Sequence, residues 1–184
     1  RYMAEYRSMR SKVSFLELCK NPELAAETTV FAAETLGVDA AILFADILLI
    51  LEPLGFHLEF SKGEGPVIHN PIRAAADSAR LDPLVDVSPL GYVYEAVRRI
   101  RAELPAKIPL IGFAGAPFTL AAYLVEGGPS KDHIRARTMM HADPQTWARL
   151  MAWSADVTGA FLRAQLLAGA SAAQLFDSWA GSLS

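Results

Sequence analysis

The sequence predicts an α/β fold built from parallel strand–helix units. Three short apolar runs, at residues 40–44, 110–113 and 172–176, alternate with longer segments whose apolar residues recur at helical spacing. Hydrophobic residues make up 52% of the 184 residues, so we expect residues 1–184 to bury one core as a single domain. A complete eight-unit βα barrel needs about 250 residues. The pattern therefore leaves open a doubly wound sheet or part of a barrel.

The first half of the chain carries clear signals for a helix, a strand and a hairpin. Asn21 followed by Pro22 is typical of a helix start, and Gly37 is typical of a helix end. Residues 40–44 follow as a buried strand. Because residues 47–51 are also apolar, the pattern does not define where this strand ends. Gly63-Glu64-Gly65 separates two short strands, 57–60 and 66–69, which predicts a hairpin.

The second half predicts two more helices, each followed by a strand. Residues 92–104 are amphipathic and precede the strand at 110–113. Asp143-Pro144 begins a long helix that ends at Gly169, before the strand at 172–176. Its apolar side chains are expected on one face of the helix. They are Trp147, Leu150, Met151, Val157, Phe161 and Leu166.

Composition excludes several classes of protein. The net charge is −3 and the pI near 5.8, which gives no indication of a nucleic-acid partner. Cys19 is the single cysteine, so an internal disulfide is excluded. Asp46 interrupts the most apolar stretch, residues 40–51, which is shorter than the ~20 residues that span a bilayer. Without a visible leader we expect a reduced, cytoplasmic protein and no membrane partner.

Candidate functional side chains follow the predicted strands, where α/β folds place their chemistry. Asp46 follows the first strand; it is either a turn or capping residue, or a carboxylate held in an apolar pocket for a donor-rich ligand. The second strand runs into a glycine-rich segment, 112–119, that lacks the basic residues of a phosphate loop. Tyr123 beyond it is either a packed aromatic or a functional hydroxyl. Ser178 follows the third strand, without the glycine pattern of a nucleophile elbow.

Residues 1–12 are basic, with Arg1, Arg7, Arg10 and Lys12 set against Glu5. Arginines at such a position either bind carboxylates or form a solvated helical face. The four histidines lack a metal-ligand spacing, so no metal is expected. Cys19 is expected to be a small buried side chain.

Four segments stand out when they are taken together: RYMAEYR (1–7), AAILFADIL (40–48), GFAGAPFTLAAYLVEGG (112–128) and QLFDSWAG (174–181). In order and spacing, these segments resemble the uroporphyrinogen decarboxylase family. The resemblance implies part of a (β/α)8 TIM barrel, with about three βα units and a short hairpin, from an N-terminal half. It also implies a homodimeric enzyme of haem biosynthesis. Without a cofactor, such an enzyme converts the four acetates of uroporphyrinogen III to methyl groups, giving coproporphyrinogen III.

Residue roles carry over from the same resemblance. Asp46 matches the aspartate that accepts hydrogen bonds from the pyrrole N–H groups, and Tyr123 matches a tyrosine beside the reacting acetate. Ser178 matches a substrate-contacting position. Arg1 and Arg10 match arginines that hold substrate carboxylates.

The chain departs from the family at a few positions, and two other functions stay open. Ala4, Ala45 and Phe118 stand where the family usually has proline, serine and tryptophan. The first alternative function is a zinc- and corrinoid-dependent methyltransferase of the same barrel superfamily. The second is a tetrapyrrole-binding scaffold without catalytic activity.

Overall fold

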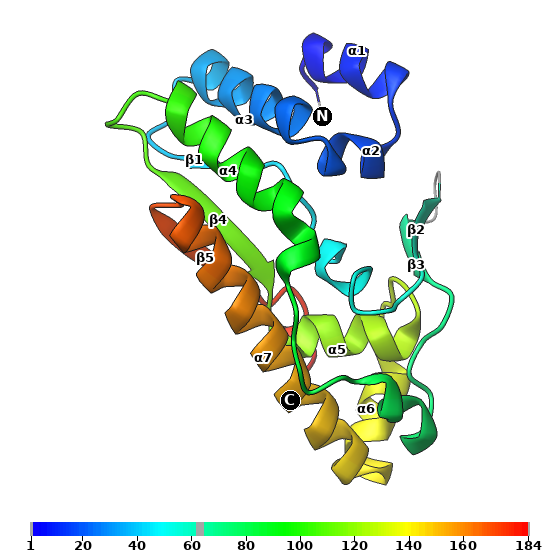
Figure 1. The fold of residues 1–184 in the computed structure, drawn as a ribbon. Coiled ribbons are helices and arrows are strands. Elements are labelled where there is room, and N and C mark those ends of the chain that lie inside the picture. Colours follow the sequence, from blue (N-terminus) through cyan, green and yellow to red (C-terminus); the bar gives the residue numbers. More distant parts are fainter. Residues whose placement is uncertain (1, 62–64, 184) are drawn as a thin grey trace. The chain divides into compact units, whose positions relative to one another are not determined.

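The computed structural model describes residues 2–61 and 65–183 (Figure 1). The chain divides into two compact units. The first unit comprises Arg1–Asp46, Pro89–Phe113 and Leu162–Gln174. The second unit comprises Ile47–Ser88, Ala114–Phe161 and Leu175–Ser184. Among the described residues, none of the helices combines the length and apolar character needed to cross a membrane.

A three-stranded sheet confirms the predicted α/β class. Its order is β1 (Ala41–Ile42), β4 (Leu110–Gly115) and β5 (Ala172–Phe176). β1 and β4 pair in parallel, with Ala41 opposite Leu110. Helices separate the strands of this sheet along the chain, as parallel pairing requires.

Three helices of the first unit lie before β1, and local sequence sets their ends. They are α1 (Ala4–Lys12), α2 (Phe15–Lys20) and α3 (Pro22–Leu36). Asn21 Oδ1 accepts from the amides of Glu23 and Leu24, and Gly37 ends α3 with a φ of +61°. The predicted helix is therefore confirmed, since a left-handed C-cap favours glycine.

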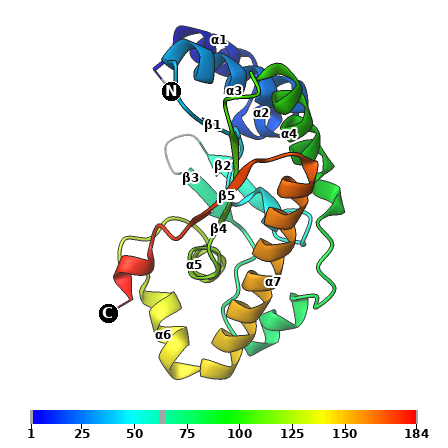
Figure 2. The ribbon, with the colours of Figure 1, turned by 90° about the vertical axis from the view of Figure 1, so that its left-hand side faces the viewer.

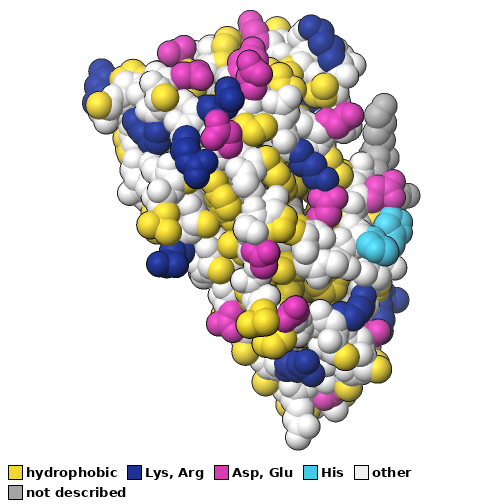
Figure 3. All heavy atoms as spheres, in the orientation of Figure 1, with side chains coloured by type: hydrophobic (Ala, Val, Ile, Leu, Met, Phe, Trp, Pro, Cys, Tyr) yellow, Lys and Arg dark blue, Asp and Glu magenta, His cyan; other side chains and the backbone are white. Residues whose placement is uncertain are grey.

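The helix α4 (Gly91–Glu103) packs along α3, and the two lie side by side in Figures 1 and 2. Val93, Val97 and Ile100 are buried, which confirms the predicted amphipathic helix. Figure 3 shows acidic and basic side chains close together over this helix, where Glu95 pairs with Arg98 and Arg99. The solvent face of α4 thus carries ion pairs.

Among its described residues, the second unit contains the hairpin, two complete α-helices and part of a third. β2 (Leu58–Ser61) and β3 (Gly65–Ile68) pair antiparallel, which confirms the predicted hairpin, although residues 62 to 64 of its turn lie outside the described residues. The helices are α5 (Pro117–Glu126) and α6 (Ile134–Ala142). The long helix α7 (Pro144–Ala168) follows, and the boundary between the units falls within it.

The structure corrects several expected elements. β1 is shorter than residues 40–44 because the Phe44 amide donates to Thr29 Oγ1 at 2.9 Å instead of continuing the ladder. The apolar run at 47–51 turns into a short 3-10 helix, Leu49–Leu51. Leu166 is 44% exposed rather than on the buried face of α7. α1 agrees with the helical alternative for residues 1–12. α2 and α6 were not expected, although Ser14 and Glu17 form a capping box before α2.

Candidate functional site

Asp46 lies in the first unit, four residues beyond the end of β1. The bond from the Phe44 amide to the buried Thr29 hydroxyl holds the backbone just before it. The Phe44 ring contacts Tyr6 and Phe15, with centroids 5.8 and 6.1 Å away. The Asp46 side chain itself is half-buried. The chain therefore presents this carboxylate from a backbone fixed by an aromatic cluster.

The charges of Arg10 and Asp46 both affect the pKa of the Cys19 thiol. That thiol is 2% exposed, and burial is the main cause that raises its pKa, to about 12. The Asp46 carboxylate raises this pKa further, and the Arg10 guanidinium opposes it. Cys19 is therefore a protonated, buried side chain, as expected, and not a nucleophile. In the first unit, two of the candidate residues thus act on the same buried thiol.

Arg10 also has a local structural role at the junction of α1 and α2. Its Nη1 donates to the Val13 carbonyl at 2.6 Å. Its guanidinium lies 5.7 Å from the centroid of the Phe15 ring, within cation–π range. Arg10 is only half-buried, so its side chain also stays accessible to an anion in solution. Arg1, the other candidate arginine, lies outside the described residues.

Tyr123 lies in the second unit, on α5, which starts directly after β4. Pro117 occupies the first turn of this helix, where its missing N–H group costs no hydrogen bond. A Cβ at Gly115 would lie 3.0 Å from Leu120 Cδ2, so only glycine fits there without displacing that side chain. The Thr158 hydroxyl, buried on α7, donates to the Gly115 carbonyl at 2.9 Å. The start of α5 is therefore tightly fixed, and Tyr123 is half-buried one turn beyond Thr119.

Ser178 lies in the loop that follows β5, and its side chain is exposed. Its neighbours in sequence hold this loop against α5. The Ala116 amide donates to the Phe176 carbonyl at 2.8 Å. Thr119 Oγ1 donates to Asp177 Oδ1 at 3.0 Å. Ser178 is thus presented to solvent from an anchored loop.

Sequence reasoning did not single out Trp179, which contacts Tyr123 directly. The two ring centroids are 4.2 Å apart with an interplanar angle of 37°. The second unit therefore brings together Tyr123 and the loop of Ser178. The spacing of Thr119 and Tyr123, four residues apart on one helical face, was visible in the sequence, but their partners more than 50 residues later were not.

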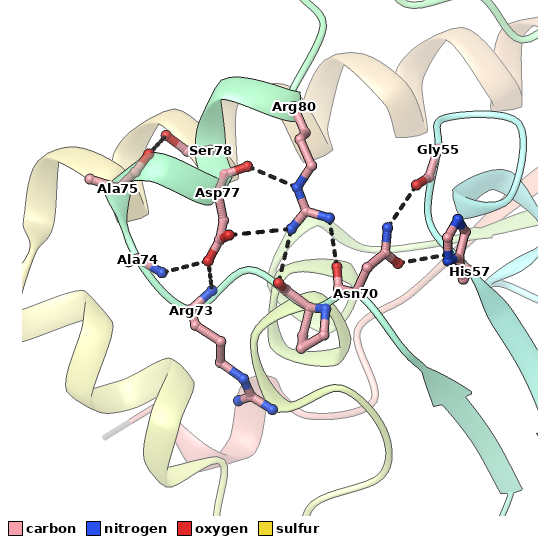
Figure 4. Close-up of polar contacts among 10 residues, drawn as sticks. Gly55, His57, Asn70, Arg73, Ala74, Ala75, Asp77, Ser78 and Arg80 are labelled. Atoms are coloured by element: carbon pink, nitrogen blue, oxygen red, sulfur yellow. Dashed lines mark hydrogen bonds and ion pairs between the residues drawn. The ribbon is translucent and has the colours of Figure 1, made fainter.

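A second group that the sequence did not reveal holds the far end of α5. The Arg73 guanidinium donates to the carbonyls of Val125 and Glu126, the last residues of the helix. Figure 4 shows how the segment of Arg73 is fixed. Asp77 accepts from the amides of Arg73 and Ala74, and these bonds lower the pKa of its carboxyl. The helix of Tyr123 is therefore held at both ends.

Neighbouring bonds in Figure 4 continue this polar network. Arg80 donates to the carbonyls of Asn70 and Pro71, both at 2.9 Å. The Asn70 side chain accepts from the His57 amide and donates to the Gly55 carbonyl. The side chains of this network bond mainly to backbone groups, and Arg80 also pairs with the Asp77 carboxylate at 3.8 Å, which indicates a structural role. Within residues 2–61 and 65–183, no group of three His, Cys, Asp or Glu side chains is arranged to hold a metal ion.

Comparisons with known proteins agree on one family. A family model described as uroporphyrinogen decarboxylase (URO-D) matches residues 1–184. The uroporphyrinogen decarboxylase of Sorangium cellulosum is 59% identical over the whole chain, and that of Leifsonia xyli subsp. xyli is 57% identical. The chain covers 52% and 50% of these two proteins. It therefore spans about half the length of the curated relatives it matches.

A solved structure extends the comparison to the fold. A methyltransferase from Methanosarcina mazei matches 88% of this chain and 47% of its own, with a TM-score of 0.66 and 18% sequence identity. At this identity the likeness concerns the fold alone. Together with the family match, it confirms that the chain forms part of a TIM barrel.

Proposed function

The chain belongs to the uroporphyrinogen decarboxylase family, and on that ground we propose that the full-length protein to which it corresponds decarboxylates uroporphyrinogen III to coproporphyrinogen III. The observation that carries the proposal is the match of the family model and of several curated relatives over the entire chain. The resemblance further implies that the reaction needs no cofactor and that the enzyme is a cytoplasmic homodimer. Those points belong to the same proposal.

The reaction replaces each acetate side chain by a methyl group. Protonation of the ring carbon next to the one that bears the acetate gives a cation whose charge reaches the acetate-bearing carbon. As CO2 leaves, the electron pair of the C–C bond forms an exocyclic C=CH2 double bond and neutralises this cation. A second proton adds to the exocyclic carbon, and one proton is lost from the ring. The balance is one proton taken up and one CO2 released for each acetate. The barrier depends on how well the protein stabilises the cation.

Asp46 is proposed to supply this stabilisation. Its carboxylate would accept hydrogen bonds from the pyrrole N–H groups, which become more acidic as the ring gains positive charge. A fixed negative charge aimed at a developing positive one lowers the barrier without reorganising in the transition state. The half-buried position of Asp46 supports the proposal, because partial burial strengthens the interaction of a carboxylate with a charged or polar ligand.

The other candidate residues are proposed to bind and orient the substrate. Arg1 and Arg10 would pair with carboxylates of the octa-acid, for which a guanidinium offers a fork of donors. The half-buried, still accessible position of Arg10 supports this role. Tyr123 would hydrogen-bond near the reacting acetate and Ser178 would contact the substrate, supported by the half-buried and exposed positions of these side chains.

The test uses the full-length protein and two aspartate variants. Asp46→Asn keeps the size of the side chain but removes its charge, so we expect turnover to fall by about 10²–10³-fold, as for other preorganised groups. Asp39→Asn, an exposed aspartate seven residues earlier, is the matched control and should keep parental turnover. Each protein is incubated anaerobically with uroporphyrinogen III, and the oxidised products are separated by chromatography.

Each outcome of this assay decides a different point. Coproporphyrin formed without added metal or corrinoid supports the decarboxylase, and unchanged uroporphyrin from the parent protein refutes it. An Asp46→Asn variant that matches the Asp39→Asn control removes Asp46 from the mechanism. Light scattering of the eluted protein tests the homodimer, which a monomeric mass at working concentration would contradict.

A further inference from the structure

Trp179 contacts two rings from different parts of the second unit. Its indole lies 4.2 Å from the Tyr123 ring of α5 and 4.2 Å from the His133 ring before α6. The interplanar angles are 37° and 43°, so both contacts are tilted stacks. A third ring, Phe118, lies 6.4 Å from His133. Tyr123 is therefore one member of a continuous aromatic group.

His133 serves this group as an aromatic ring and not as a polar one. It is 3% exposed, and neither of its ring nitrogens has a hydrogen-bond partner among the described residues. Its backbone lies in the left-handed region, with a φ of +49°. Both features are unfavourable, so other contacts must hold the residue here. The Ser130 hydroxyl, which accepts from the His133 amide at 3.0 Å, provides one of them.

The loop of Trp179 is tied to the same face of α5 at a second point. Thr119 is fully buried one turn before Tyr123, and its hydroxyl donates to Asp177 at 3.0 Å. Asp177 and Trp179 flank Ser178. Two side chains of α5 thus contact the two neighbours of Ser178, one by a hydrogen bond and one by stacking.

We propose that Trp179 is a positioning residue that fixes the Tyr123 ring, and with it the place of the Tyr123 hydroxyl relative to Ser178. This inference rests on the proposed function, which makes Tyr123 and Ser178 substrate contacts. A tyrosine hydroxyl lies at the end of a side chain with two free torsions, so a small rotation displaces it considerably. Misplacement of a catalytic group by about 1 Å can cost 10²-fold in rate.

The activity test compares two tryptophans of the second unit in the full-length protein. Trp179→Leu removes the stacking surface, and we expect kcat for uroporphyrinogen III to fall by about 10–100-fold with little change in KM. Trp179→Phe keeps a ring and should recover part of this loss. Trp153→Leu is the control, because Trp153 is 5% exposed and packs on Phe56, outside the Tyr123 group.

A double-variant cycle separates positioning from general weakening of the fold. If Trp179 acts through Tyr123, Trp179→Leu should cost little in a protein that already carries Tyr123→Phe. Multiplying losses in the double variant would refute the inference, as would equal kcat values for Trp179→Leu and Trp153→Leu. Thr119→Val should lower kcat in the same way, with Thr119→Ser restoring it, because only the serine keeps the donor to Asp177.

A spectroscopic readout decides the inference even if the parent protein fails to turn over uroporphyrinogen. The protein is labelled with fluorotyrosine, and the signal of position 123 is identified by its loss in Tyr123→Phe. A neighbouring indole shifts this resonance through its ring current. We expect Trp179→Leu to move the Tyr123 resonance and Trp153→Leu to leave it in place. An unmoved resonance in Trp179→Leu would overturn the proposed contact, whereas a moved resonance without turnover would overturn only the decarboxylase.

Discussion

The fully buried Gln165 of α7 offers a sharp test of how the strand before the glycine-rich segment is held. Its Oε1 accepts from the Phe113 amide and its Nε2 donates to the Phe113 carbonyl, both at 2.9 Å. One side-chain amide therefore engages both backbone groups of a residue on β4. Gln165→Leu keeps similar bulk but removes both bonds. A buried backbone group that loses its partner costs about 1–3 kcal/mol, so we expect the free energy of unfolding to fall by about 2–4 kcal/mol.

Gln165→Glu tests hydrogen bonding separately from packing, because its stability should change with pH in a direction that packing alone does not predict. Once ionised, the new carboxylate could accept from the Phe113 amide, but its second oxygen would face the Phe113 carbonyl without a proton to donate. Only the protonated carboxyl reproduces both bonds, so folding should raise its pKa. The stability of this variant should therefore be highest below about pH 4, near the ordinary pKa of glutamate, and be lost as the pH rises through the raised value.

Urea unfolding followed by circular dichroism measures both effects, against Gln145→Leu as the control. Gln145 is exposed near the start of the same helix, and its replacement should change stability by less than about 0.5 kcal/mol. A Gln165→Leu variant as stable as this control would refute the reasoning. So would a Gln165→Glu variant whose stability, relative to the parent protein, does not depend on pH.

Three further predictions follow from groups described above. In Gly112→Ala, the new Cβ would lie 2.6 Å from Gln165 Oε1, so the thermal midpoint should fall. The fall should be smaller in a Gln165→Ala background, because the clashing side chain is then absent. Cys19 should resist a disulfide reagent at pH 8 until urea unfolds the protein. Folding raises the pKa of the Cys19 thiol from 9.0 to about 12, so the folded state favours the protonated thiol. The contribution of this protonated thiol to the free energy of unfolding should be fully present below pH 9 and be lost as the pH rises toward 12, and Cys19→Ala should not show this loss. Arg73→Gln should lower the free energy of unfolding by about 1 kcal/mol, and Arg73→Lys should not fully restore it, since an ammonium cannot reproduce the paired bonds to the carbonyls of Val125 and Glu126.

The helix α3 was predicted correctly because neighbouring residues set both of its ends. Asn21 and Gly37 act on the backbone of the helix between them, so the bounds of α3 could be read directly. α6 lacks such a local signal. His133 precedes it without a side-chain cap, and the Ala136 amide is instead bonded by Glu126, ten residues earlier. A cap supplied from a distant part of the chain leaves no local pattern, so the helix was missed.

The same distinction applies to the candidate site. Asp46, Tyr123 and Ser178 became candidates because each follows a predicted strand in a segment that resembles one family. Trp179 and Thr119 did not, because what matters about them is a contact across more than 50 residues. The sequence shows which residues have suitable chemistry and where strands end. It does not show which side chains meet once the helices pack.

The residues that hold the site differ in burial from those proposed to act in it. Thr29, Thr119 and Thr158 are each at most 4% exposed, and each bonds a group beside a strand end. Asp46 and Tyr123, by contrast, are half-buried. Loss of a buried hydroxyl leaves its partner without water to replace it, so it should lower stability together with kcat. In Asp46→Asn a polar group of the same size stays at a position that solvent reaches, so kcat should fall while the unfolding midpoint changes much less.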